Sequence, residues 1–281
     1  AELCCYACAG EHACNVWETK MSTLPPLVPP IAPARVNYNR HLSIVAPFGW
    51  LRAGARDLKT QPGSSLLYGL FVFMTSLAVV LGMRLIGWDQ VLFPALAGFM
   101  VVGPIIAVGL YEKSRRIAAR EPVTLTKMIF VKATSGGQII FTGAMLMLLM
   151  LLWMRAAVII YALFFGLRPY PGLNEIVHIL LNTPSGWAML VVGGSVGALF
   201  ASFAFAISIF SVPMLLDEDI DAFTAMGTSM ALAWNNLPAM ICWGLIVVAL
   251  FGLCLTTGLL GLIVIFPLLG HASWHAYQAV R

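Results

Sequence analysis

The sequence predicts an all-α fold, a polytopic membrane helical bundle, and two observations lead to this class. Of 281 residues, 60% are hydrophobic and only 10% are charged, against about 25% charged in an ordinary soluble domain. No Asp, Glu, Lys or Arg occurs in the 59 residues from Ala222 to Val280. A membrane-spanning helix needs only about 20 apolar residues, so this stretch alone is long enough for two passes.

Composition also excludes two other classes. The net charge of +4 is spread over short loops and forms no basic face, so nucleic acid is not an expected partner. A transmembrane β-barrel needs strands that alternate apolar and polar residues, and the long apolar runs do not alternate. The lipid bilayer is therefore the expected surroundings, with a membrane-protein partner or a second copy of the chain as further contacts.

The first twenty residues differ from the rest, because they hold four of the six cysteines and no apolar run. Cys5 and Cys8 have a Cys-x-x-Cys spacing, but a metal site normally needs a second pair of ligands. We expect Met21 to be the start and residues 1–20 to be a non-native or mis-started extension; a small metal or redox site is the alternative. Residues 21–63 are expected to form a cytoplasmic segment with an interfacial helix.

Residues 64–281 are expected to form the membrane domain, with six transmembrane helices arranged as three hairpins, each preceded by an interfacial helix. The expected passes cover about 64–83, 91–111, 139–166, 186–216, 238–256 and 258–277. A weak internal repeat supports the count. The moderately polar segments Pro47–Lys59, Val123–Thr134 and Asp221–Trp234 each end at a helix breaker before a hairpin.

The basic residues indicate the orientation, since short loops rich in Lys and Arg stay in the cytoplasm. Of 16 basic residues, 13 fall before the first expected pass, in the second-to-third connection or at Arg281. Only Arg84 and Arg168 fall on the other side. We expect a multi-pass protein of a bacterial inner membrane with both termini in the cytoplasm.

Two histidines near the end of the chain are the only candidates for a cofactor or metal. His271 and His275 are four residues apart and therefore share one helix face, where imidazoles can ligate haem, copper or zinc. Two ligands rarely complete a metal site. The alternative is that both rings lie with Trp274 and Tyr277 at the headgroup level, where Trp274 and Tyr277 would anchor the helix. We expect no cofactor, with haem as the alternative.

The charged connections suggest a latch. Arg115, Arg116 and Arg120 follow the second pass, whereas Asp217, Glu218 and Asp219 follow the fourth. The two groups are expected to meet as ion pairs or to bind a partner; helix capping by the acidic residues is compatible with either.

Two further features concern the passes themselves. Arg155 is the only charge inside an expected pass, and we expect it to reach the outer interface as a membrane anchor. Gly193, Gly197 and Ala201 recur every four residues, as close helix packing in lipid requires.

Four strings resemble one bacterial family, the domain of unknown function 2189 family of predicted integral membrane proteins. They are Trp50–Gly54, the stretch from Val102 to Glu112, Ser211–Asp217 and Phe266–Tyr277. Some members are labelled as cytochrome c oxidase subunits, but the family has no established activity and supplies no catalytic residues. A haem–copper catalytic subunit needs about six histidines on facing helices, which excludes that role here.

The expected function is that of a non-enzymatic accessory or assembly component of a membrane complex, such as a respiratory oxidase. Two alternatives stay open: a transporter or channel component, and a haem- or quinone-binding membrane redox protein.

Overall fold

Uncharged apolar stretches form the longest helices of the fold, which is seen in a computed structural model that describes residues 37–166 and 170–281. The expectations for residues 1–20, Met21 and Arg168 lie outside the described residues. The helices are α2 (Ala46–Lys59), α3 (Pro62–Leu85), a 3-10 turn η1 (Asp89–Val91), α4 (Leu92–Ile106), α5 (Val108–Ala118), α6 (Leu125–Ile129), α7 (Gly136–Phe165), α8 (Leu173–Asn182), α9 (Pro184–Ser208), α10 (Ser211–Asp217), α11 (Ala222–Asn235), α12 (Leu237–Thr256) and α13 (Leu262–Val280).

The all-helical membrane class is confirmed, whereas the six-pass arrangement is not. Five helices in the described residues are long and apolar enough to cross a membrane: Pro62–Leu85, Pro94–Ala118, Gly136–Phe165, Pro184–Asp217 and Leu237–Thr256. The second and fourth combine two helical pieces, α4 with α5 and α9 with α10. The expected sixth pass corresponds to α13, which carries Ser273 and two histidines and buries much of its surface in the protein.

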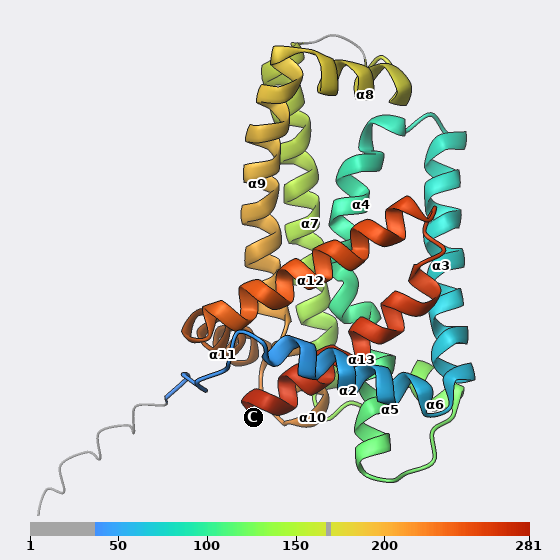
Figure 1. The fold of residues 1–281 in the computed structure, drawn as a ribbon, viewed down its shortest axis with the longest axis vertical. Coiled ribbons are helices and arrows are strands. Elements are labelled where there is room, and N and C mark those ends of the chain that lie inside the picture. Colours follow the sequence, from blue (N-terminus) through green and yellow to red (C-terminus); the bar gives the residue numbers. More distant parts are fainter. Residues whose placement is uncertain (1–36, 167–169) are drawn as a thin grey trace, which may run out of the picture. The chain divides into compact units, whose positions relative to one another are not determined.

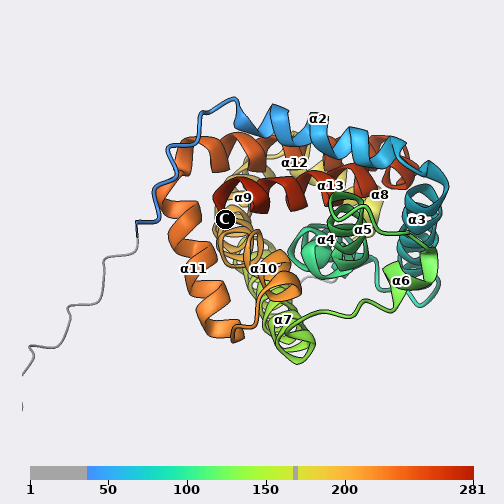
Figure 2. The same ribbon diagram turned by 90° about the horizontal axis from the view of Figure 1, so that it is seen from below.

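The last two helices form a hairpin that lies obliquely against the bundle. Figure 1 shows its turn at about the level of the middle of α3, and α13 then returns towards α2. Viewed from below, α13 lies between α2 and α5 (Figure 2). Glycines allow α13 to approach α2 and α3 closely. A Cβ at Gly54 of α2 would lie 2.6 Å from Ala272 N, and one at Gly69 of α3 would lie 2.2 Å from Ile263 O.

The short helices depart from the expected repeat. Helices α2 and α11 form where interfacial helices are expected, but α6 has only five residues, Leu125–Ile129. An additional helix, α8, forms within the connection of the second hairpin and lies across the ends of α7 and α9 (Figure 1). Its apolar residues recur three and four positions apart, which is the period of a helix. Prolines just before this segment favour a turn instead, and the sequence therefore predicts no helix there.

The glycine stripe of α9 faces α7. A Cβ at Gly197 would lie 3.0 Å from the ring of Trp153, and one at Gly193 would lie 3.8 Å from Ile160. Ala201, the third member, lines a cavity. Tighter approaches in the described residues are elsewhere, at Gly54, Gly69, Gly109 and Gly186, where a Cβ would lie 2.2–2.6 Å from a backbone atom.

Candidate functional site

A chain of buried polar side chains joins α2, α3, α5 and α13. Its first member is Lys113, which is fully buried and donates to Ser65 Oγ at 2.7 Å, Ser64 Oγ at 3.1 Å and Gln61 O at 2.9 Å. An ammonium has three donors and no acceptor, so these three contacts use all of its hydrogen-bonding capacity. Ser65 must therefore accept from Lys113, and its own hydroxyl hydrogen is left for His271.

His271 continues the chain with both ring nitrogens. Its Nε2 lies 2.9 Å from Ser65 Oγ, and its Nδ1 lies 2.8 Å from Ser114 Oγ. Because Ser65 donates to Nε2, the neutral tautomer with a hydrogen on Nδ1 fits, and that hydrogen is donated to Ser114. Ser114 in turn lies beside the carboxylate of Asp57 and lowers its pKa, as a donated hydrogen does; the carboxylate also accepts from His275 Nε2 at 2.9 Å.

The direction of this relay is fixed by its ends, because Lys113 can only donate and the Asp57 carboxylate can only accept. We call Lys113, Ser65, His271, Ser114 and Asp57 the polar relay. Burial raises the pKa of Asp57, but the hydrogen bond from His275, the Ser114 hydroxyl and the charges of the two histidines together lower it by more, so the pKa lies below 3.8. Buried polar groups cost free energy unless they are paired, and the relay leaves each of its groups paired.

The relay alters the interpretation of both histidines. Both ring nitrogens of His271 are engaged by serines, and His275 is engaged by Asp57. Among the described residues there is no group of three or more His, Cys, Asp or Glu that could hold a metal ion. In this structure the two histidines form hydrogen bonds that link α13 with α2, α3 and α5.

The expected membrane anchors Trp274 and Tyr277 require a correction. Both rings are buried, at 2% and 0% exposure, because the same helix face that carries them packs into the protein core. Tyr277 OH donates to Glu218 Oε1 at 2.7 Å. Arg155, in contrast, is exposed on the last third of α7, which is compatible with the anchor that the sequence suggests.

The two charged connections do not pair with each other as the latch requires. Arg115 and Arg116 bind Glu112 of their own helix, with nitrogen–oxygen distances of 2.7 Å and 2.5 Å. Arg115 also donates to the carbonyl of Leu216 at 3.2 Å, so the connections do touch through the backbone. Glu112 is fully buried, and it attracts the two guanidinium groups within one helix turn.

The acidic residues find other partners. Asp217 forms an ion pair with Arg281, and Glu218 lies 3.8 Å from the same guanidinium. Asp219 accepts from Ser135 at 3.5 Å. Arg120 is exposed and occupies a left-handed turn position, with φ of 57°, just after α5.

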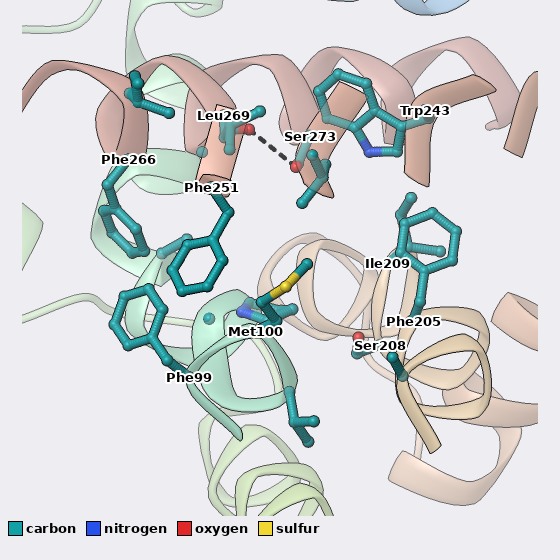
Figure 3. Close-up of a pocket in the computed structure, with 18 of the residues that line it drawn as sticks. Phe99, Met100, Phe205, Ser208, Ile209, Trp243, Phe251, Phe266, Leu269 and Ser273 are labelled. Carbon is teal, nitrogen blue, oxygen red and sulfur yellow. Dashed lines mark hydrogen bonds between the residues drawn. The ribbon is translucent and has the colours of Figure 1, made fainter. Parts of the chain in front are cut away.

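An apolar cavity of about 140 Å³ lies between α4, α9, α12 and α13 (Figure 3). Aromatic rings dominate its wall: Phe99, Phe205, Trp243, Phe251 and Phe266. The rings of Phe99 and Phe251 are stacked with centroids 5.7 Å apart, and Phe266 lies 6.0 Å from Phe99. Pockets of this kind, largely apolar with few polar groups, are typical of small-molecule sites.

Three hydroxyl groups reach the cavity wall. Ser273 Oγ donates to the carbonyl of Leu269 at 2.9 Å, the bond drawn in Figure 3, and Tyr111 is hydrogen-bonded to Ser273. Ser208 is different. It is 2% exposed, and none of the side-chain hydrogen bonds in the described part of the chain involves its Oγ.

A second hollow, the crevice, lies beside the cavity, between α3 and α4. It measures about 390 Å³ and is lined by α3 residues such as Phe71, Val72 and Val79. It shares Phe99, Phe251 and Leu262 with the cavity. Exposed apolar side chains surround it, including Phe71 at 71% exposure, so its mouth faces the region that lipid covers.

Sequence reasoning missed the relay residues Asp57, Ser65, Lys113 and Ser114, and it missed the cavity. One signal was present, because Lys113 and Ser114 directly follow the quoted family string that ends at Glu112. A charge at the end of an apolar helix, however, is usually solvated, so the sequence alone gave no reason to expect it buried.

Comparison with known proteins supports the membrane class and adds no activity. The family described as "Predicted integral membrane protein (DUF2189)" matches residues 92–217. This confirms the resemblance over the segment from α4 to α10, which is similar to a family described as integral membrane proteins. No curated protein and no solved structure matches the chain.

Proposed function

We propose that this integral membrane protein binds an apolar small molecule that enters from the lipid phase. The observation that carries the proposal is the wall that the cavity and the crevice share, formed by Phe99, Phe251 and Leu262. A molecule dissolved in lipid meets the crevice first and reaches the cavity by displacing the stacked Phe99–Phe251 pair. Its apolar surface would fill a space that water hydrates poorly, which favours binding.

The lining favours this function over two alternatives. No Asp, Glu, Lys or Arg lines the cavity or the crevice, whereas ion-coupled transport needs charged or polar groups along its path. Haem is disfavoured in these hollows because neither His271 nor His275 lines them, and both ring nitrogens of His271 are already engaged by serines. A quinone, by contrast, needs no histidine ligand and stays compatible with the cavity.

We propose a non-enzymatic accessory role, in which the bound molecule is held for a neighbouring protein of the same membrane complex, such as a respiratory oxidase. The exposed apolar faces of α7 and α9, with Leu163 at 77% and Leu199 at 71% exposure, are available to lipid or to such a neighbour. A proposed bacterial inner-membrane location agrees with this role.

The charge distribution supports a proposed orientation. Arg52, Arg56 and Arg281 lie with the basic end of α5 at one end of the bundle, and Arg84 ends α3 at the other (Figure 1). The positive-inside rule places the first end in the cytoplasm. Reporter fusions after Trp88 and Glu175 should then report the periplasm, and fusions after Arg120 and Arg281 the cytoplasm; a periplasmic signal after Arg281 would reject this orientation.

The binding proposal is tested by filling the cavity. Gly103 lines it, and a Cβ there would meet no atom within 4 Å, so Gly103→Leu places a side chain in open space. The matched control is Gly194→Leu, because Gly194 is equally uncrowded, lies in α9 and lines neither hollow.

The protein is purified in mild detergent, and the bound apolar molecules are extracted and identified by mass spectrometry. We expect one species to be retained in proportion to protein by the wild type and by Gly194→Leu, and lost from Gly103→Leu. Equal retention, or none, in all three proteins would reject the proposal.

A further inference from the structure

The hydroxyl of Ser208 points to the chemistry of the ligand. Ser208 is the last residue of α9, is 2% exposed and lines the cavity. Figure 3 shows its hydroxyl oxygen on the cavity side of the helix. The neighbouring serine of the cavity, Ser273, gives its hydrogen to Leu269, whereas no side-chain bond of Ser208 exists within the described residues. A hydroxyl that lines an apolar cavity and has no side-chain bond can donate to a ligand, so a ligand acceptor there would be favourable.

The size of the cavity restricts the group that can supply this partner. An apolar cavity of about 150 Å³ holds a single benzene ring, and this one measures about 140 Å³. Its walls carry the faces and edges of Phe205, Trp243 and Phe251. Aromatic walls favour a planar group, because offset stacking and edge-to-face contacts add to the burial of apolar area.

The crevice accounts for the rest of the ligand. Its volume of about 390 Å³ runs along apolar residues of α3 and α4, and the stacked Phe99 and Phe251 form the wall between it and the cavity. A linear apolar chain fits such a space, and its far end would reach the surrounding lipid. The ring in the cavity and the chain in the crevice would be parts of one molecule.

We propose that the ligand is a single six-membered ring that carries a carbonyl oxygen and an apolar tail, as in an alkylated quinone, and that the carbonyl accepts a hydrogen bond from Ser208. This proposal rests on the proposed function and specifies its ligand. The tail lies in the crevice, and the ring stacks among the aromatic residues of the cavity.

The test uses two probes with the same tail, decylbenzoquinone and decylbenzene, titrated into the purified full-length protein by calorimetry. Ser208→Ala removes the hydroxyl and keeps the helix. The matched control is Ser195→Ala in the same helix, because Ser195 is exposed and donates to Val191 O at 2.7 Å. Loss of one hydrogen bond of about 0.5–1.5 kcal/mol corresponds to a factor of about 2 to 10 in affinity.

We expect Ser208→Ala to weaken the binding of decylbenzoquinone by this factor and to leave decylbenzene unchanged, with no effect of Ser195→Ala. If both probes bind and Ser208→Ala affects neither, the carbonyl proposal is wrong but the binding of apolar molecules stands. If neither probe binds to the wild type, the ligand proposal is wrong. If, in the extraction experiment, Gly103→Leu also retains the same molecules as the wild type, the proposed function is wrong as well.

Discussion

Replacing His271 by Ala should destabilise the fold through the polar relay. The substitution removes the hydrogen bonds to Ser65 at 2.9 Å and to Ser114 at 2.8 Å, so a donor of Ser65 and an acceptor of Ser114 lose their partners inside the protein. Each unsatisfied group costs about 1–3 kcal/mol, and the vacated volume at a residue of 0% exposure adds a cavity cost. We expect a loss of about 3 kcal/mol or more, taking each group near the lower end of that range.

The assay is thermal unfolding of the purified protein in one detergent. A loss of about 3 kcal/mol corresponds to a fall in Tm of about 6–12 °C, at about 2–4 °C per kcal/mol. The control is His178→Ala, because His178 is exposed on α8, and surface substitutions usually change stability by at most about 0.5 kcal/mol. His271→Gln should lie between the two, since an amide can both donate and accept. Equal Tm values for His271→Ala and His178→Ala would refute the relay as a stabilising element.

Three further predictions concern the contacts around α13. Because the pKa of Asp57 lies below 3.8, its stabilising contribution is present above about pH 3.8 and is lost as the pH falls through the lowered pKa. Asp57→Asn should therefore lower the Tm at pH 7 and flatten the dependence of Tm on pH below pH 4. A pH dependence of Tm that is the same as in the wild type would contradict this prediction. Gly54→Ala should lower the Tm, because its Cβ would lie 2.6 Å from the backbone of α13. The control Gly49→Ala on the same helix meets no atom within 4 Å and should raise the Tm slightly. Equal shifts of Tm in the two variants would refute the close contact. Arg281→Glu should lower the free energy of unfolding by about 0–1 kcal/mol, the usual contribution of an exposed ion pair. Asp217→Arg should partly restore the stability, and the effect of either substitution should become smaller at high salt. Additive effects of the two substitutions on Tm would show that the two residues do not interact.

The membrane class and the long helices could be predicted because they depend on local sequence. Apolar runs identify α3 and α7 to within a few residues of the expected passes, with Arg155 as the one charge inside the expected pass of α7, and the expected pass 186–216 covers α9 and α10 together. The α13 segment also lacks Asp, Glu, Lys and Arg, and the sequence therefore predicts a pass there, but it is less apolar than the five candidate spans. What the sequence does not reveal is that His271, Trp274 and Tyr277 pack against α2 and α5, since that depends on helix positions fixed by glycines far away in the chain.

The relay and the cavity could not be predicted for the same reason. Asp57, Lys113 and His271 are separated by more than fifty residues from one another, and only the packing of α2, α5 and α13 brings them together. The latch shows the reverse error. Charge alone suggested that Arg115 would meet Asp217, but Glu112 lies within one helix turn of Arg115 and forms the ion pair instead.

The central claim, that the cavity binds an apolar molecule from the lipid phase, is tested most directly by titrating decylbenzene into the wild type and two glycine variants by calorimetry in the same detergent. We predict saturable binding with a stoichiometry of one for the wild type and for Gly194→Leu, and an affinity at least about tenfold weaker for Gly103→Leu, equivalent to about 1.4 kcal/mol. Affinities that are the same in all three proteins, or binding that never saturates, would contradict the claim.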